Sequence, residues 1–369
     1  MTPLAIFIPE IGLATETFIR WDVTELLPGG TVVVADPPPG GLSQHGKAIW
    51  ALDHHPSLIF TPVDGDPPPS NERIDEALSF LANQGVVVVL VEYLDFADRW
   101  FDALYASGRR IWIRGHGIDL SARLRDEQMA KAYQRYTRAD GIIVPSENAA
   151  QNLVAVGLPA EKIHVVRYPV QTPSTSRPHA GAEMRCVAVG RLVPKKAPLI
   201  MLEAFRLASL AEPHLTLDLV GHGPLMDDVL AYVAAWNLRE SVRVHGRVSH
   251  DRALELLRGA DTLLHHAVTA PDGDTEGQPL AVLEAMAAGL AVVSTNHAGI
   301  PEIVTDQVNG RLVAEHDVAA MAAAIISLAL DPGLRVRFGS AARRTIGREH
   351  TASHARQELR RLLRLEAPS

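Results

Sequence analysis

The sequence predicts an α/β protein made of two doubly wound domains, each with a parallel sheet covered by helices on both faces. Short β-branched runs alternate with longer amphipathic segments, which is the pattern of repeated strand–helix units. A length of 369 residues is enough for two domains of ordinary size. The alternation stops at 170–184, where proline, serine, threonine and glycine occur without an apolar period. We therefore expect domains at 1–172 and 185–348, a linker at 173–184, and a C-terminal helix at 349–369 that could return to the first domain.

The individual elements follow from the same alternation. In the first domain the expected strands are 4–8, 31–35, 86–91, 110–114, 141–144 and 163–166, and the expected helices are 16–27, 72–83, 121–138 and 147–156. In the second domain the expected strands are 185–189, 216–220, 242–245, 262–265, 291–295 and 311–313, and the expected helices are 198–211, 224–236, 250–258, 279–288, 318–330 and 333–349. Ligands of such sheets bind outside the carboxyl ends of the strands, so we expect a cleft built from both domains.

Composition narrows the function classes. Hydrophobic residues make up 47% and charged residues 21% of the chain, as in a soluble globular protein. The net charge of −8 and the lack of a basic tract disfavour nucleic acid and a polybasic membrane foot. We expect no stable membrane insertion, because no apolar stretch has the length of a membrane-spanning helix. Cys186 is the single cysteine, and the chain starts directly in a strand-like segment, so we expect a cytoplasmic location.

The most informative segment is 272–302, which contains Glu276 and Glu284 with seven residues between them. Pro279 suits the first turn of a helix, which would place Glu276 in the preceding loop and Glu284 inside the helix. Two such carboxylates can hold the hydroxyl pairs of a sugar and a ribose. The alternative is that both glutamates are simply solvated, and the glycine and proline residues around them make this alternative less favoured. The helix start would offer a diphosphate its free amides, in the segment Gly277, Gln278, Pro279 and Leu280.

A second signal follows the strand 185–189. Gly190 is succeeded by Arg191 and Lys196 in a loop marked by glycine and proline, at the strand end where a ligand should lie. Arginine offers a planar fork to phosphate oxygens, and lysine offers a mobile point charge. Two fixed cations can stabilise a departing diphosphate without a metal. A plain surface-charge role is the alternative.

Histidines and an acidic pair raise the question of a metal. His116 follows the strand 110–114 between two glycines, so we expect its ring at a strand's carboxyl end. His54-His55 and His265-His266 lack companion ligands at convincing spacing. Asp272-Gly273-Asp274 mimics a metal-binding Asp-x-Asp pair, but we expect it to form a turn. We therefore predict no metal site and no essential magnesium.

Taken together, these segments resemble the family-4 retaining glycosyltransferases of GT-B fold, in which two Rossmann-like domains face each other across a cleft. The matching motifs cover nearly the whole second half: Gly190-Arg191-x4-Lys196, Val220-Gly-His-Gly-Pro224, Glu276-x7-Glu284 and Ala298-Gly-Ile-Pro-Glu302. Their detail is similar to the subgroup that acts in exopolysaccharide assembly, including colanic-acid-type enzymes. The first half matches more thinly, through Thr15-Glu-Thr-Phe-Ile19 and Gly115-His-Gly-Ile-Asp119. Thr15 stands in place of the subgroup's serine, and Ala197 in place of a frequent glycine.

The resemblance implies transfer of a hexose-type sugar from a UDP-sugar, favoured over a GDP-sugar, by a front-face mechanism without metal. Arg191 and Lys196 would bind the donor diphosphate, Glu276 the sugar hydroxyls and Glu284 the ribose. Gly12 would lie near the diphosphate, and the base would pack near Gly246. His116 would line the reacting face. On the acceptor side the expected residues are Glu16, Thr17, His116 and Asp119.

Other functions remain open at this point. A GT-B-like sugar-nucleotide epimerase or a sugar phosphorylase is the main alternative. A binding protein without catalysis is disfavoured because Glu276, Arg191 and Lys196 are all present. A nicotinamide dehydrogenase is disfavoured because no G-x-G-x-x-G follows the first strand. The acceptor stays unknown: a saccharide, a lipid-linked saccharide and a small natural product are all compatible with the sequence.

Overall fold

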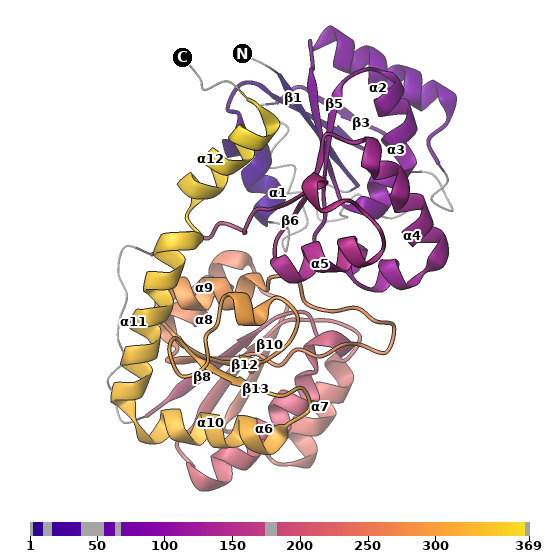
Figure 1. Ribbon diagram of the computed structural model, residues 1–369. Coiled ribbons are helices and arrows are strands. Elements are labelled where there is room, and N and C mark those ends of the chain that lie inside the picture. The colour runs from indigo at the N-terminus through magenta and orange to yellow at the C-terminus, as the bar shows by residue number, and fades with distance from the viewer. Residues whose placement is uncertain (1–2, 10–16, 38–54, 63–67, 174–182, 366–369) are drawn as a thin grey trace. The chain divides into compact units, whose positions relative to one another are not determined.

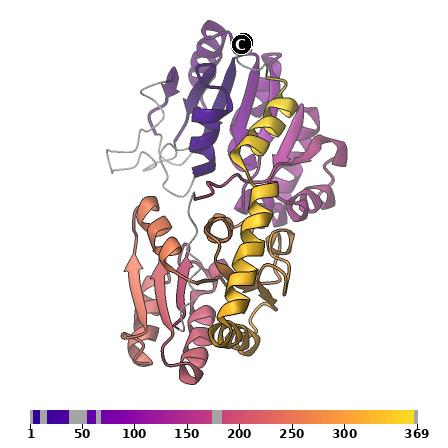
Figure 2. The same cartoon turned by 90° about the vertical axis from the view of Figure 1, so that its left-hand side faces the viewer.

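The computed structural model describes residues 3–9, 17–37, 55–62, 68–173 and 183–365 (Figure 1). The chain divides into two compact units, one of Met1–Arg167 with Ser353–Ser369 and the other of Tyr168–Ala352. Each unit contains one parallel sheet, and in both views helices lie on the two faces of each sheet (Figures 1 and 2). The predicted α/β class with two doubly wound sheets is confirmed.

The first unit has a seven-stranded sheet in the order β3-β2-β1-β4-β5-β6-β7. All described strand pairs in it are parallel. Most of these strands are buried along their whole length, which explains why their sequences are continuous Val/Ile/Leu runs rather than alternating ones. The strands are β1 (Leu4–Ile8), β2 (Thr31–Ala35), β3 (Ser57–Ile59), β4 (Val88–Glu92), β5 (Arg110–Arg114), β6 (Gly141–Val144) and β7 (Ile163–Val165).

The helices of the first unit begin at side-chain caps in several places. Ser70 Oγ accepts the amide of Arg73 at the start of α2, and Ser146 Oγ accepts that of Ala149 at the start of α5. The helices are α1 (Thr17–Trp21, continued by a π-helical turn at Asp22–Leu26), α2 (Asn71–Asn83), α3 (Leu94–Ala106), α4 (Glu127–Tyr133), α5 (Glu147–Ala155) and α12 (Ala352–Leu363).

One predicted helix is wrong as a single element. The segment 121–138 forms a 3-10 turn at Ala122–Arg125, then α4, then a second 3-10 turn at Gln134–Arg138. The break occurs because Asp126 is extended and its carboxylate accepts the amides of Gln128 and Met129, which starts a new helix there.

The C-terminal helix packs within the first unit. The guanidinium of Arg110 donates to the carbonyl of Leu363 at 3.0 Å, and Arg360 donates to that of Leu26 at 2.8 Å. Arg356 pairs with Glu25 at 3.0 Å. These contacts explain why Ser353–Ser369 is grouped with Met1–Arg167.

The second unit has a six-stranded sheet in the order β10-β9-β8-β11-β12-β13, again parallel throughout its described pairs. Helices α6 and α10 pack side by side on one face, and α8 and α9 lie on the other (Figure 1). The strands are β8 (Arg185–Val189), β9 (Thr216–Val220), β10 (Val242–Gly246), β11 (Thr262–Leu264), β12 (Ala291–Thr295) and β13 (Arg311–Val313). The helices are α6 (Pro198–Ala211), α7 (Met226–Ala235), α8 (His250–Gly259), α9 (Leu280–Ala288), α10 (Val318–Leu330) and α11 (Pro332–Glu349).

The segment between the two units differs from the expected linker. The second unit begins at Tyr168, whereas the sequence placed the boundary at 172–173. The amide of Tyr168 donates to Gln278 Oε1 at 3.0 Å, and the amide of Val170 donates to the carbonyl of His350 at 3.0 Å. These bonds attach residues 168–170 to the second unit.

None of the helices among the described residues is by itself both long and apolar enough to cross a bilayer, and Val318–Leu330 with Pro332–Leu363 reaches that length and hydropathy only as a pair bent by 105°.

Candidate active site

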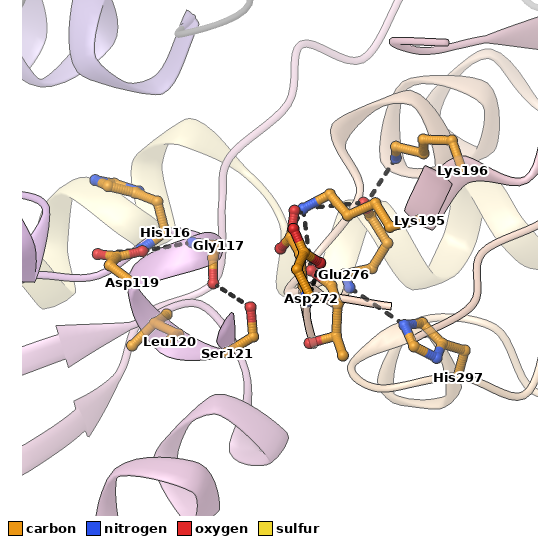
Figure 3. A network of polar contacts seen from close by, with 12 residues as sticks. His116, Gly117, Asp119, Leu120, Ser121, Lys195, Lys196, Asp272, Glu276 and His297 are labelled. Atoms are coloured by element: carbon orange, nitrogen blue, oxygen red, sulfur yellow. Dashed lines mark hydrogen bonds and ion pairs between the residues drawn. The ribbon is translucent and has the colours of Figure 1, made fainter. Parts of the chain in front are cut away.

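A charged cluster lies in the second unit at the carboxyl ends of four adjacent strands, β8, β11, β12 and β13. Its members come from the loop that follows each of these strands. Figure 3 shows Lys195 and Lys196, from the loop after β8, and His297, from the loop after β12, reaching toward the segment of Glu276. The cluster consists of Lys195 and Lys196 after β8, Asp274 and Glu276 after β11, His297 after β12 and Glu315 after β13.

The loop after β8 is held in place by close backbone contact with the loop after β9. A Cβ on Gly221, whose φ is +148°, would lie 1.8 Å from the carbonyl oxygen of Gly190. A Cβ on Gly223 would lie 2.4 Å from the carbonyl oxygen of Leu192, whose amide donates to His222 O at 3.0 Å. Only glycine fits at either position. The Val220-Gly-His-Gly-Pro224 motif therefore serves to position the cation-bearing loop.

Lys196 and Glu276, both predicted site residues, form a largely buried ion pair. Lys196 Nζ lies 2.8 Å from Glu276 Oε2 (Figure 3). Burial alone would raise the pKa of Glu276, but Lys196 and Lys195 outweigh it and lower that pKa to about 2. Burial also lowers the pKa of Lys196, partly offset by Glu276 and reinforced by the charges of Lys195 and Arg191. Glu276 is therefore a carboxylate at every physiological pH.

Lys195 is a member of the site that the sequence analysis did not single out. Its Nζ donates to Asp274 Oδ1 at 2.9 Å and to the carbonyl of Thr275 at 3.1 Å, and it lies 3.7 Å from Glu276 Oε1. The side chain is buried, whereas Arg191 in the same loop is exposed. Lys195 therefore holds the loop that carries Glu276, and Arg191 is open to solvent or ligand.

The ring of His265 is a hydrogen-bond partner of the Lys196 ammonium. Its Nε2 lies 3.3 Å from Lys196 Nζ and its Nδ1 lies 2.9 Å from Ser294 Oγ. Burial first, and then the charge of Lys196, lowers the pKa of His265 to about 3. The ring is therefore neutral, with Nε2 accepting from the ammonium and Nδ1–H donating to the serine. Its place directly after β11 was the available sequence signal, but His265-His266 was considered only as a metal pair.

The segment before α9 has a mixed outcome. The helix begins at Leu280, with Pro279 as its N-cap, one residue later than predicted. Gln278 was expected to offer the donor its backbone amide, which stays a prediction; its buried side chain has a structural role, with Oε1 accepting the amide of Tyr168. Gly277 lies between Glu276 and Gln278, and is partly buried.

Glu284 lies one turn inside α9, as predicted. Burial raises the pKa of its carboxyl to about 7, and His250 Nε2 lies 3.6 Å away. Gly246, the expected neighbour of the base, ends β10 with a φ of +67°.

In the first unit His116 follows β5 and is buried. Its Nε2 lies 2.7 Å from Glu92 Oε2 at the end of β4, and its ring stacks on Phe18 at 4.3 Å between centroids. Burial, with the nearby Arg114, lowers the pKa of His116 to about 3. Burial raises the pKa of Glu92 to about 7 despite Arg114. A single proton thus bridges the two groups, and the imidazole is uncharged.

Asp119 does not have the geometry of an acceptor contact. It is fully buried, and its carboxylate accepts the amides of His116 at 3.1 Å and Gly117 at 2.8 Å (Figure 3). It also accepts the amide of Leu94 at 3.0 Å. We therefore revise its role to holding the loop that carries His116. Three other predicted residues stay untested: Gly12 and Glu16 lie outside the described residues, and Thr17 begins α1 but its side chain is not described.

The acidic pair forms a turn, as expected. Asp272 Oδ1 accepts the amide of Asp274 at 3.0 Å, and Gly273 between them has a φ of +88°. Within the described ranges, no group of three or more His, Cys, Asp or Glu has the arrangement of a metal site.

These two units, with a buried lysine–carboxylate site at the carboxyl edge of the second sheet, define a two-domain α/β protein of GT-B fold. Solved structures agree: HepE of Anabaena in complex with UDP-glucose matches with a TM-score of 0.80 and 17% identity, over 99% of this chain and 100% of that one. Sucrose-phosphate synthase of Thermosynechococcus elongatus matches with a TM-score of 0.78 and 17% identity, over 99% and 98%. At such identities the likeness establishes the fold alone.

The sequence identifies the family. Residues 176–345 match the glycosyl transferases group 1, and residues 29–173 match glycosyltransferase family 4. The chain therefore belongs to these glycosyltransferases, as its motifs predicted.

Curated relatives agree with the predicted subgroup. The amylovoran biosynthesis glycosyltransferase AmsK of Erwinia amylovora is 32% identical over 252 residues, 67% of this chain and 62% of AmsK. WcaL of Escherichia coli strain K12, whose name assigns it to colanic acid biosynthesis, is 34% identical over 218 residues, 56% of this chain and 52% of WcaL. The resemblance to the exopolysaccharide subgroup is confirmed, while the chain spans only about half to three fifths of these relatives.

Proposed function

We propose that this protein transfers a hexose-type sugar from a nucleotide-diphosphate donor to an acceptor hydroxyl with retention of the anomeric configuration. The observation that carries the proposal is the buried pair of Lys196 and Glu276, 2.8 Å apart at the carboxyl edge of the second sheet. It supplies a cation for the diphosphate and an ionised carboxylate for sugar hydroxyls within one side-chain length. A cytoplasmic location, expected from the single cysteine, belongs to the same proposal.

Charge stabilisation is the main contribution that we assign to the second unit. Cleavage of the glycosyl–phosphate bond leaves negative charge on the departing diphosphate. Lys196, the exposed guanidinium of Arg191 and the amides at the start of α9 are positive groups fixed before the reaction. A bound diphosphate would share the Lys196 ammonium with Glu276, so that charge stays compensated in both states. We propose that these groups make a divalent cation unnecessary.

The sugar-binding role falls to Glu276. Its pKa of about 2 keeps it a hydrogen-bond acceptor throughout the working range. Hydrogen bonds from donor-sugar hydroxyls to a carboxylate are charge-assisted and directional, which suits the orientation of the anomeric carbon. Glu284 would bind the ribose, and the base would pack near Gly246.

His116 is proposed to line the reacting face as a neutral ring that Glu92 orients. The acceptor hydroxyl would attack from the face that the diphosphate leaves, and its proton would pass to a phosphate oxygen. No charge on His116 is needed for this step, which fits its pKa of about 3.

For the donor and the acceptor we propose a chemical class and not a particular compound. UDP-sugars are favoured by the habits of the family, and the names of AmsK and WcaL place those relatives in amylovoran and colanic acid biosynthesis. We therefore propose a saccharide of exopolysaccharide assembly as the acceptor. Thermal shift with UDP, GDP, ADP and their sugars would identify the base, since a ligand that binds only the folded state raises Tm.

The decisive test is replacement of the sugar-binding carboxylate. Glu276→Ala and Glu276→Gln should lower transfer by about 100-fold or more, roughly 3 kcal/mol of transition-state binding. Thermal unfolding of each variant controls for folding, and proton NMR of the product gives its anomeric configuration. Wild-type rates in a folded Glu276→Gln variant would refute the assignment.

The alternatives separate in the same assay. A sugar-nucleotide epimerase would convert the donor without any acceptor. A phosphorylase would release sugar 1-phosphate when inorganic phosphate is supplied. Either product, formed faster than transfer, would replace the proposed reaction.

A further inference from the structure

We infer that His297 and Glu315 act as a positioning pair for Glu276, in which Glu315 sets the tautomer of His297 and His297 holds the backbone amide of Glu276. The inference rests on the proposed sugar-binding role of Glu276. Among the described residues, the two side chains contact backbone amides of the loop after β11 and not the Glu276 carboxylate, so their influence on the reaction acts through the loop. They are therefore positioning residues and not catalytic ones.

Sheet order brings the pair together. β12 and β13 are paired with Thr295 opposite Val313, so His297 and Glu315 leave the sheet at the same edge, each two residues after its strand. Short backbone bonds fix the histidine: its amide donates to the carbonyl of Thr295 at 2.9 Å, and its carbonyl accepts the amide of Ile300 at 3.0 Å. The ring is buried beside the loop after β11.

The contacts define the tautomer of His297. The amide of Glu276 lies 3.2 Å from Nε2, and an amide N–H can only donate, so Nε2 must carry a lone pair. Nδ1 then carries the hydrogen and donates to Glu315 Oε1 at 2.6 Å. A protonated ring, or the opposite tautomer, would direct an N–H at the Glu276 amide and break this bond. A carboxylate on Nδ1 selects the required form.

Glu315 contacts both ends of the loop after β11, one directly and one through His297. Its second oxygen, Oε2, accepts the amide of Thr269 at 3.0 Å, near the start of the loop. The first oxygen acts on Glu276, near the end of the loop, through His297. Burial opposes ionisation of Glu315, but the Thr269 amide and His297 outweigh it, and the pKa of Glu315 lies below its usual value. One carboxylate therefore sets the distance between the two ends of the segment that carries the site.

Without His297 the buried amide of Glu276 would lose its acceptor. A buried amide without an acceptor is costly enough for the loop to shift toward another partner. The shift would move the carboxylate that reads the sugar, whereas Lys196 and Arg191 would keep their places after β8. We therefore expect a loss in the transfer step with little change in the affinity for the nucleoside diphosphate.

Three variants test the pair. His297→Leu should lower kcat for transfer by about 10–100-fold, the usual range for residues that orient a site from behind, while the Kd for UDP or GDP changes by less than about twofold. His297→Gln supplies an amide oxygen for Glu276 N–H and should recover most of the loss. His316→Gln is the matched control, since it changes an exposed histidine next to Glu315 and should behave as wild type.

Nitrogen-15 NMR of the wild-type histidine rings gives a readout independent of activity. The His297 ring, assigned by its disappearance in His297→Gln, should show a protonated Nδ1 and an unprotonated Nε2, and Glu315→Leu, which removes the acceptor at Nδ1, should weaken that preference. A protonated Nε2 in the wild type would overturn the inference, even if His297→Leu failed to fold.

Activity measurements distinguish a failure of the positioning role from a failure of the proposed function. If Glu276→Gln abolishes transfer but folded His297→Leu retains wild-type kcat, or loses diphosphate affinity as strongly as kcat, only the positioning role is overturned. If Glu276→Gln itself transfers normally, the proposed function of that carboxylate fails, and the positioning role with it.

Discussion

The buried carboxyl of Glu284 predicts opposite effects of rising pH on protein stability and on donor affinity. Burial raises its pKa from 4.5 to about 7, so the folded protein holds the neutral form more readily than the unfolded chain does. The stability that this group contributes is fully present below pH 4.5 and is lost as the pH rises through 7. At pH 8 the interval corresponds to about 3 kcal/mol of destabilisation, because one pKa unit is about 1.4 kcal/mol. Glu284→Gln removes this cost.

Urea unfolding at two pH values measures the effect. The Glu284→Gln variant should be more stable than wild type by up to about 3 kcal/mol at pH 8 and by about 1 kcal/mol or less at pH 5. A difference that does not change with pH would refute the reasoning, and so would a variant less stable than wild type at pH 8.

Donor affinity should move the other way. If the ionised form binds the ribose, the ionised fraction is about 90% at pH 8 and about 10% at pH 6, so the wild-type Kd for the nucleoside diphosphate should rise about tenfold over that interval. Calorimetric titration with UDP or GDP checks this, and Glu284→Gln should bind weakly at both pH values. Equal affinity of wild type at pH 6 and 8 would show that the carboxylate is not the binding form.

Two further predictions concern the loops that carry the cations. Lys195→Met should lower stability by about 1–3 kcal/mol because it removes the ammonium that pairs with Asp274 and donates to the carbonyl of Thr275, and Lys195→Met with Asp274→Asn should recover part of the loss in a double-mutant cycle of urea unfolding. Gly221→Ala should cost more than about 2 kcal/mol, since its Cβ would lie 1.8 Å from a carbonyl oxygen, and should weaken diphosphate binding. Gly347→Ala, in α11 with nothing within 4 Å, should instead stabilise by about 0.5–1 kcal/mol, and equal Tm values for the two glycine variants would contradict the packing argument.

Local sequence pattern predicted most of the fold. Strands such as Thr31–Ala35 and Ala291–Thr295 match the prediction residue for residue, because a continuous β-branched run is required wherever a strand is covered on both faces. Helix α3 was missed because Tyr93, with a φ of 70°, is the only residue between it and β4, so the apolar run shows no turn signal. The break at Asp126 was missed because an internal cap resembles an ordinary polar face.

The site was predicted less completely than the fold. Lys196 and Glu276 were found because glycine and proline mark their loops. Their partners Lys195, His297 and Glu315 were not found, since those contacts join loops after different strands. Such contacts depend on the order β8-β11-β12-β13, which follows from packing and not from any local pattern. In the first unit, a glutamate and an arginine inside apolar strands were the available signals for Glu92 and Arg114.

The attachment of Tyr168 has a practical consequence for exchanging parts between related enzymes. Its amide donates to Gln278, and its carbonyl accepts from His350 Nδ1 at 3.0 Å. A graft made at 172–173 would replace Tyr168 by a foreign residue while keeping these two partners, which are shaped for the native one. Junctions after Arg167 and between residues 352 and 353 keep Tyr168 together with its hydrogen-bond partners. Hybrids that combine a new first unit with this second unit should therefore be joined there.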